Sequence, residues 1–245
     1  MNKNTVKVYE SAKALAQAAA VAVIDAAEQA IAHRGRFTIA LSGGSTPPLM
    51  YKQLVNMQSD WSKWVVFVSD ERWVPEDDAI SNLGVAMREL LGRVAIPSGN
   101  IMHPYSHDLD AVNGAERYEM LLRQHASDAA SPSGIRLDLV LLGVGDDGHT
   151  ASLFPGKPAI EEQIRLVTAS PHGVLPPPVE RITFTFPAIN SARQCFILAV
   201  GDKKSDVVAW SLKNTLTDHT YPVQRVRLTN GELTWMLDKD AASKL

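Results

Sequence analysis

The sequence contains a single cysteine and no strong excess of either charge. Its 24 basic and 27 acidic residues give a net charge of −3. One cysteine, Cys195, excludes a disulfide within the chain and is typical of a reducing compartment. A charge this close to zero excludes the basic surface field of proteins that bind nucleic acid or membrane surfaces. We therefore expect neither partner, and an anionic ligand would need a local cluster of basic side chains.

The sequence also lacks a segment typical of export or membrane insertion. Its first residues contain no basic stretch followed by an apolar one. The longest weakly polar stretch, residues 14–24, lies between Lys13 and Asp25. It is shorter than the roughly 20 residues that a membrane-spanning helix needs. We therefore predict a cytoplasmic protein.

Apolar strands alternate with helical patterns along the chain. A helical periodicity from about 11 to 33 stops at Gly35, a residue typical of helix C-terminal caps. Further helices are expected from the 42–46 loop to about 57 and at 83–91, 111–126 and 205–212, and strands at 37–41, 64–68, 137–142, 182–186 and 195–200. Continuous apolar strands are typical of parallel sheets covered on both faces. We predict an α/β fold, a mostly parallel sheet with helices on both faces in a Rossmann-like three-layer architecture, as one domain over 1–245.

Four unusual loops each follow a predicted strand. They span residues 42–46, 69–82, 143–156 and 201–204. In open parallel sheets ligands bind beyond the carboxyl ends of the strands. We therefore expect these four loops to meet at one edge of the sheet.

The first of these loops, in the stretch LSGGSTPP, combines Gly43, Gly44, Ser45 and Thr46. Glycines permit close backbone approach, Ser45 or Thr46 can cap the helix that follows, and N–H groups at a helix start suit phosphate. The loop lacks the Gly-Lys-Ser/Thr of a Walker loop and the last glycine of a hydrolase elbow. It is either a phosphate-binding loop or a well-capped turn.

The third loop begins GVGDDG, which matches the G-x-G-x-x-G pattern of dinucleotide-binding turns. Asp146 and Asp147 would place two negative charges where the pyrophosphate lies. The acidic residue expected about 20 positions later is absent, since residues 167–170 read VTAS. This context argues against dinucleotide binding.

His149 follows these two carboxylates. Histidine is the usual general base near neutral pH, and a neighbouring carboxylate can orient it. One alternative is a metal site formed by Asp146, Asp147 and His149 with Asp70 or Glu71. The other is an exposed polar turn without a ligand.

Basic residues occur in or near three of the predicted loops. Arg72 follows Asp70 and would either pair with an acid or stabilise an oxyanion. Lys203 and Lys204 lie at a helix start, where a cation is unfavourable unless an anion is bound, or they are simply solvated. Arg181 follows the stiff stretch LPPPVE, and this position alone favours a surface arginine.

Together the stretches LSGGSTP, SDERWVP…SNLG, LLGVGDDGHTASLFPG, ERITFT and GDKK resemble the 6-phosphogluconolactonase family, in that family's order, from about residue 6 to 237. The resemblance implies an α/β fold related to glucosamine-6-phosphate isomerases. It implies hydrolysis of 6-phosphoglucono-δ-lactone, a sugar-phosphate lactone, in the pentose phosphate pathway without a metal or other cofactor. By position it implies His149 as the general base, Asp70 and Arg72 at the sugar and its carbonyl end, and a phosphate site formed by Gly43, Gly44, Ser45, Thr46, Arg181 and Lys204.

Two other functions fit this resemblance less well. Sugar-phosphate isomerases and deaminases of the same fold carry a glutamate five positions after the histidine, where this sequence has Phe154. Phenylalanine cannot transfer a proton. A sugar-phosphate sensor of a transcription repressor would need a DNA-binding segment, and only about ten residues precede the first predicted helix.

Overall fold

The computed structural model describes residues 3–171, 178–214 and 221–245. Its main sheet has six parallel strands in the order β1-β9-β8-β5-β2-β3. Their bounds are β1 Lys3–Tyr9, β2 Phe37–Leu41, β3 Trp64–Val68, β5 Leu139–Gly143, β8 Gln194–Ala199 and β9 Glu232–Asp238. The predicted parallel sheet is therefore confirmed.

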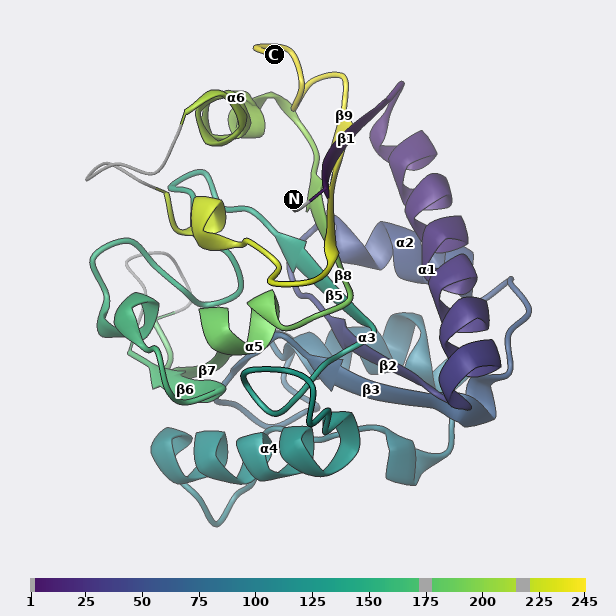
Figure 1. Ribbon diagram of the computed structural model, residues 1–245, viewed down its shortest axis with the longest axis vertical. Helices are drawn as coiled ribbons and strands as arrows, with labels where there is room; N and C mark the ends of the chain where they lie inside the picture. Colours follow the sequence, from purple (N-terminus) through teal and green to yellow (C-terminus); the bar gives the residue numbers. More distant parts are fainter. Residues whose placement is uncertain (1–2, 172–177, 215–220) are drawn as a thin grey trace.

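Helices cover both faces of this sheet, as predicted. They are α1 Ala12–Arg34, α2 Pro47–Leu54, α3 Asn82–Glu89, α4 Ala111–Ala126, α5 Phe186–Asn190 and α6 Ser205–Lys213. Helices α1 and α2 lie on one face, and α5 and α6 on the other (Figure 1). Buried apolar side chains from all these layers form one continuous cluster.

A second, smaller sheet was not expected. It contains three antiparallel strands in the order β4-β7-β6, with bounds β4 Asp70–Arg72, β7 Arg181–Phe184 and β6 Val167–Ser170. The strand predicted at 182–186 exists but belongs here, and α4 packs against this sheet. The stretch LPPPVE, residues 175–180, lies partly outside the described residues, which omit 172–177.

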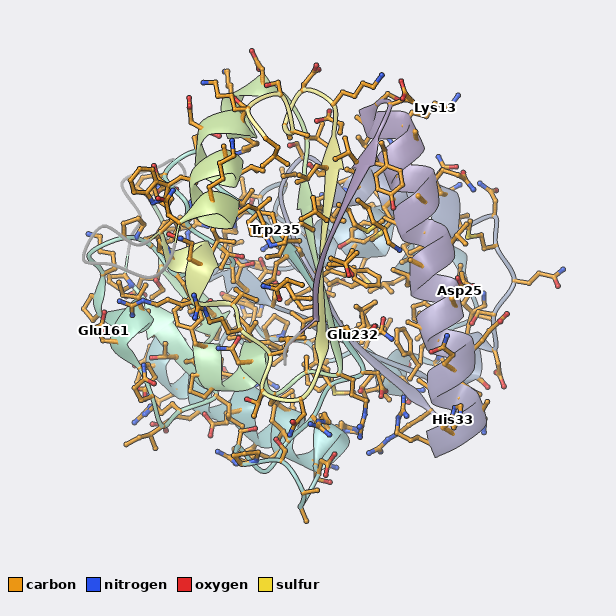
Figure 2. All side chains as sticks on the ribbon, turned by 45° about the horizontal axis from the view of Figure 1, so that its top comes forward. Lys13, Asp25, His33, Glu161, Glu232 and Trp235 are labelled. Atoms are coloured by element: carbon orange, nitrogen blue, oxygen red, sulfur yellow. The ribbon has the colours of Figure 1, made fainter. Side chains whose placement is uncertain are left out.

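Helix α1 begins and ends at the residues that its sequence indicates. The Ser11 hydroxyl accepts a hydrogen bond from the N–H of Ala14 at 3.2 Å, and Gly35 ends the helix in the left-handed conformation with φ 74°. Such N- and C-terminal caps satisfy backbone groups that the helix leaves open. Figure 2 shows Lys13, Asp25 and His33 on the outer side of this helix.

Helix α1 also passes a test of length and composition for a membrane span, with a mean hydropathy of 1.3 over its most apolar window. No other helix in the described part of the chain does so. Half of that window is buried against the rest of the fold, on an alanine-rich side that includes Ala19, Ala20 and Ala27. In this structure α1 is a core helix.

The order of the strands creates a switch point between β2 and β5. The chain runs outward from β2 to β3, returns to β5 on the other side of β2, and continues to β8 and β9. Ligands bind at such a point because the loops on either side diverge and leave a crevice. Here the loops after β2 and β5 are the two glycine-rich segments, 42–46 and 143–149.

We expect Gly114→Ala to destabilise the fold although it lies inside α4. Alanine is the better helix former by about 1 kcal/mol. A Cβ at this position would, however, overlap the ring of Trp73, the residue after Arg72, and overpacking costs about 1–3 kcal/mol. Chemical denaturation should show a net loss of up to about 2 kcal/mol. The exposed neighbour Val112→Ala is the control, with a change under about 0.5 kcal/mol; a gain in stability for Gly114→Ala would contradict this packing.

Candidate active site

The four predicted loops meet at the carboxyl edge of the main sheet. They enclose a cavity of about 180 Å³. The cavity is lined by every site residue that the family resemblance implies: Gly43, Gly44, Ser45, Thr46, Asp70, Arg72, His149, Arg181 and Lys204. Residues from separate parts of the chain therefore share one site because their strands are neighbours in the sheets.

The 42–46 loop turns at Gly44, whose φ of 93° favours glycine. The prediction that Ser45 or Thr46 caps the helix is wrong: Thr46 holds the N-cap position in a helical conformation, and its side chain makes no cap hydrogen bond. Pro47 and Pro48 begin α2 and have no N–H groups. An anion here would meet the loop's own N–H groups and hydroxyls rather than the first N–H groups of the helix.

The 143–149 turn folds back on His149. The N–H of Gly145 donates to the carbonyl of His149 at 2.8 Å, and the N–H of Gly148 to that of Gly145 at 3.0 Å. A Cβ on Gly145 would overlap the imidazole, and Gly148 has φ 77°. These two glycines serve the tight turn that presents the histidine. The next turn includes Ala151 with φ 48°, a conformation that costs energy for a non-glycine residue and is concentrated at functional sites.

Asp147 holds the His149 ring. Its Oδ1 lies 2.5 Å from Nδ1 of the imidazole and also accepts the backbone N–H of His149 at 3.1 Å. Burial raises the pKa of Asp147, but the hydrogen bonds and the charge of His149 outweigh it, so the net shift is downward. An ionised carboxylate only accepts, so Nδ1 carries the hydrogen. The other ring nitrogen, Nε2, is then the basic one.

Asp146 has a different partner. Its Oδ1 lies 2.5 Å from Nζ of Lys204, the residue before the first turn of α6. The two carboxylates of the turn therefore face an amine and an imidazole rather than each other. Over the described ranges, no group of three or more His, Cys, Asp or Glu side chains could hold a metal ion. The metal alternative therefore finds no ligand set in these residues.

Asp70 is buried at the cavity wall. Its Oδ2 accepts a hydrogen bond from the Ser152 hydroxyl at 2.6 Å. Ser152 in turn is bound through its backbone to the hydroxyls of Ser170 and Thr183 in the small sheet. This chain of contacts fixes the position of the Asp70 carboxylate relative to the His149 turn.

Arg72 and Arg181 lie directly opposite each other in the β4–β7 pair. Opposed residues of an antiparallel pair share one face, and like charges there are destabilising. Arg181 is only 5% exposed, which corrects the expectation of a surface position. Burial and, to a lesser degree, Arg72 lower the pKa of Arg181, whereas Asp70 opposes this. Two guanidinium groups on one cavity wall would be stabilised by a bound anion.

Arg72 does not pair with an acid in the part of the chain that the structure describes. Its Nη1 donates to the carbonyl of Ile80 at 2.9 Å and to Oδ1 of Asn82 at 2.5 Å. Both acceptors are neutral, so they orient the guanidinium without cancelling its charge. The pairing alternative for Arg72 is therefore wrong within these residues.

Sequence reasoning missed Asn82, and it considered Glu71 only as an alternative metal ligand. Asn82 lines the cavity, and Glu71 is 1% exposed in β4, next to Arg72. The only local sequence signal for this region was the pair Ser81-Asn82, which is typical of a helix start. In the structure the Ser81 hydroxyl accepts a hydrogen bond from the N–H of Gly84 at 2.9 Å and caps α3. A cap shows where a helix begins but not that the next side chain points into a site.

Comparison with known proteins supports these assignments of fold and family. The chain is 40% identical over 97% of its length to the probable 6-phosphogluconolactonase 3, chloroplastic, of Oryza sativa subsp. indica, covering 75% of that protein. It is 37% identical over 99% of both chains to the 6-phosphogluconolactonase of Nostoc sp.. The solved 6-phosphogluconolactonase of Trypanosoma brucei superposes with a TM-score of 0.88 at 29% identity over all of both chains. The family model for glucosamine-6-phosphate isomerases/6-phosphogluconolactonase matches residues 10–235, and the chain therefore belongs to this family.

Proposed function

We propose that this protein hydrolyses 6-phosphoglucono-1,5-lactone to 6-phosphogluconate, as a metal-free step of the pentose phosphate pathway. The observation that carries the proposal is the placement of His149, held by Asp147, in one cavity with Arg72, Arg181 and Lys204. The relatives named above as 6-phosphogluconolactonases support it. One domain over 1–245 and a cytoplasmic location are part of the proposal, although one relative is named as chloroplastic.

The phosphate end of the substrate would lie against the 43–46 loop. Gly43 and Gly44 allow its backbone to approach, and Ser45 and Thr46 supply hydroxyl donors. Arg181 and Lys204 would supply the positive charge. Because the phosphate is remote from C1, its binding energy is available to orient the lactone. Asp146 would leave Lys204 when the phosphate arrives, since both are anions and compete for one ammonium group.

His149 would act on water at the carbonyl end. Its Nε2 takes one proton from the water while the water oxygen bonds to C1, which gives a tetrahedral oxyanion and an imidazolium stabilised by Asp147. Arg72 stabilises that oxyanion, and Asp70 contacts the sugar. The bond between C1 and the ring oxygen then breaks, and the imidazolium returns its proton to that oxygen. The new carboxylic acid ionises, so water is the only co-reactant.

Isomerisation or deamination is the alternative within this family. Opening a sugar ring moves one proton to the ring oxygen and another from the anomeric hydroxyl. A carboxylate beside the histidine would serve that relay, but Phe154 occupies this place, with its ring centre 4.7 Å from that of His149. The ring has no titratable group. This contact favours hydrolysis, which needs one base only.

The direct test is hydrolysis of fresh 6-phosphogluconolactone by the purified protein against the spontaneous rate. We expect saturable hydrolysis that survives prolonged chelation and dialysis, with no conversion of glucosamine 6-phosphate to fructose 6-phosphate. Robust deaminase activity would overturn the lactonase proposal. Activity that is lost on chelation and returns with Mg²⁺, Mn²⁺ or Zn²⁺ would return Asp146, Asp147 and His149 to the role of ligands.

His149→Ala should lower kcat by roughly 10²–10⁴, the usual size of a general-base effect. The imidazole is 23% exposed, so thermal unfolding should change little. Asp147→Asn should also lower kcat, because an amide no longer fixes the hydrogen on Nδ1. The lowered pKa of Asp147 keeps its carboxylate ionised down to acidic pH, so the loss in Asp147→Asn should be present across the neutral range. Near-normal turnover in His149→Ala would refute its role as the base.

Lys204→Ala should impair use of the phosphorylated lactone far more than use of unphosphorylated gluconolactone. The lost contact is charge-assisted and worth about 1.5–3 kcal/mol, or roughly 10- to 150-fold in kcat/KM. Asp146→Asn is the matched control from the other side of the same ion pair. It removes the competing anion and should lower KM for the phosphorylated lactone, by up to about fivefold for a largely exposed pair. Equal losses on both substrates in Lys204→Ala would show that this lysine does not bind phosphate.

A further inference from the structure

Asn82 contacts two parts of the cavity wall: Gly43 in the 42–46 loop and Arg72 in β4. It is the first residue of α3, is 3% exposed, and lines the cavity between Arg72 and the 42–46 loop, called the glycine loop below. No step of the hydrolysis described above uses it. A buried amide with both polar atoms at the wall of a site needs partners, because an unsatisfied polar group is costly there.

Both polar atoms of the Asn82 side chain have a hydrogen-bond partner. The amide oxygen can only accept and the amide nitrogen can only donate. Its Oδ1 accepts from Nη1 of Arg72 at 2.5 Å, and its Nδ2 donates to the backbone carbonyl of Asp70 at 2.8 Å. The two partners lie at the two ends of β4, Asp70–Arg72. A single side chain thus spans this short strand and fixes the guanidinium relative to the Asp70 backbone.

The same amide packs against the glycine loop. A Cβ built on Gly43 would overlap Oδ1 and Cγ of Asn82 and lie 2.7 Å from its Nδ2, and these are the three nearest atoms. Gly43 is not among the glycines with positive φ, so its backbone conformation is open to alanine. The side chain of Asn82, rather than the backbone, is what requires glycine at position 43.

Glu71 holds the backbone of Asn82 in this place. Its Oε1 accepts the N–H groups of Arg72 and Asn82, both at 2.7 Å. Its Oε2 accepts the N–H of Leu83 at 2.8 Å and the Ser81 hydroxyl at 3.0 Å. Burial raises the pKa of Glu71 to about 7, and the four hydrogen bonds oppose this shift. The carboxylate therefore joins β4 to the first turn of α3.

We propose that Asn82 is a positioning residue, which sets the distance between the Arg72 guanidinium and the glycine loop. The proposal rests on the proposed lactonase function, in which Arg72 serves the carbonyl end and the loop binds the phosphate. A substrate held at both ends reacts only if those ends have the right separation, since a misplacement of about 1 Å costs up to roughly 10²-fold in rate. Asn82 supplies that separation through one hydrogen bond and one packing contact.

Asn82→Ala should lower kcat roughly 10- to 100-fold on both the phosphorylated lactone and gluconolactone, because Arg72 loses its acceptor. This differs from Lys204→Ala, whose loss is confined to the phosphorylated substrate. Ser81→Ala is the matched control: it removes the cap of the same helix and one of the four hydrogen bonds to Glu71, but it keeps the Asn82 amide and the two backbone N–H bonds that flank it. We expect it to change kcat less than about threefold at a similar loss of stability. If Ser81→Ala lowers kcat as much as Asn82→Ala, the role of Asn82 is only to stabilise α3, and the proposal fails.

A double-mutant cycle tests the packing contact. Gly43→Ala alone should lower kcat/KM for the phosphorylated lactone at least tenfold, because the new methyl group displaces the amide. In the Asn82→Ala background the same change should cost less than about threefold, since the obstructing atoms are gone. Losses that multiply in the double variant would show that the two residues act independently and would overturn the proposal.

The free energy of unfolding of the same four proteins (wild type, Gly43→Ala, Asn82→Ala and the double variant) gives a second double-mutant cycle. This measurement does not depend on catalytic turnover. If the wild-type protein hydrolyses no lactone, the proposed function fails, whereas the unfolding cycle still decides whether Gly43 and Asn82 form one unit. Asn82→Ser, which retains a small hydroxyl acceptor, replaces the alanine variant if that variant does not fold. Because the serine keeps one small polar atom, its effects should have the same direction as those of Asn82→Ala but be smaller.

Discussion

The site depends on the parallel pairing of β2 with β5. Ile39 lies opposite Leu139 and Ala40 opposite Val140, and all four residues are fully buried. Apolar strands packed on both faces have a strongly specified position, because a shifted register would move each side chain into space packed for a different one. Since the strand order reverses here while all strands stay parallel, the loops after β2 and β5 lead away in different directions and leave a crevice between them. Pairing of β8 with β5 adds Lys204 to the same edge.

At this edge of the sheet the carboxylates each have a hydrogen-bond or ion-pair partner, and basic side chains line the cavity. Asp70 accepts from Ser152, Asp147 binds His149, and Asp146 pairs with Lys204. Arg72 is oriented by neutral oxygens only, within the residues described, and lies opposite Arg181. A protein with a net charge of −3 thus presents a local positive wall. The electrostatic cost of two opposed guanidinium groups is lowest when an anion lies between them, which suits a phosphorylated substrate with a developing oxyanion.

The apolar strands and the site loops could be predicted from the sequence because their signals are local. Residues 37–41 and 64–68 are continuous apolar runs, and both form strands with those bounds. β4 and β6 have three and four residues of mixed polarity, and they are strands only because β7 pairs with both. The burial of Arg181 has the same origin, since it follows from pairing with a segment more than 100 residues away in the sequence. Asn82 was missed because its role consists of contacts with Gly43 and Arg72, which no local pattern encodes.

Phe154 places an aromatic ring beside both His149 and Arg181. Its ring lies 4.7 Å from that of His149 on one side, and the Arg181 guanidinium lies over it at 5.4 Å. An aromatic face attracts a cation without accepting a proton. The ring therefore helps to hold Arg181 in the cavity wall while keeping a second proton carrier away from the imidazole. A carboxylate at this position would pair with the Arg181 guanidinium, reduce the positive charge offered to the substrate, and add a second path for protons beside His149. An apolar residue here is consistent with a reaction in which one histidine removes a proton and returns it.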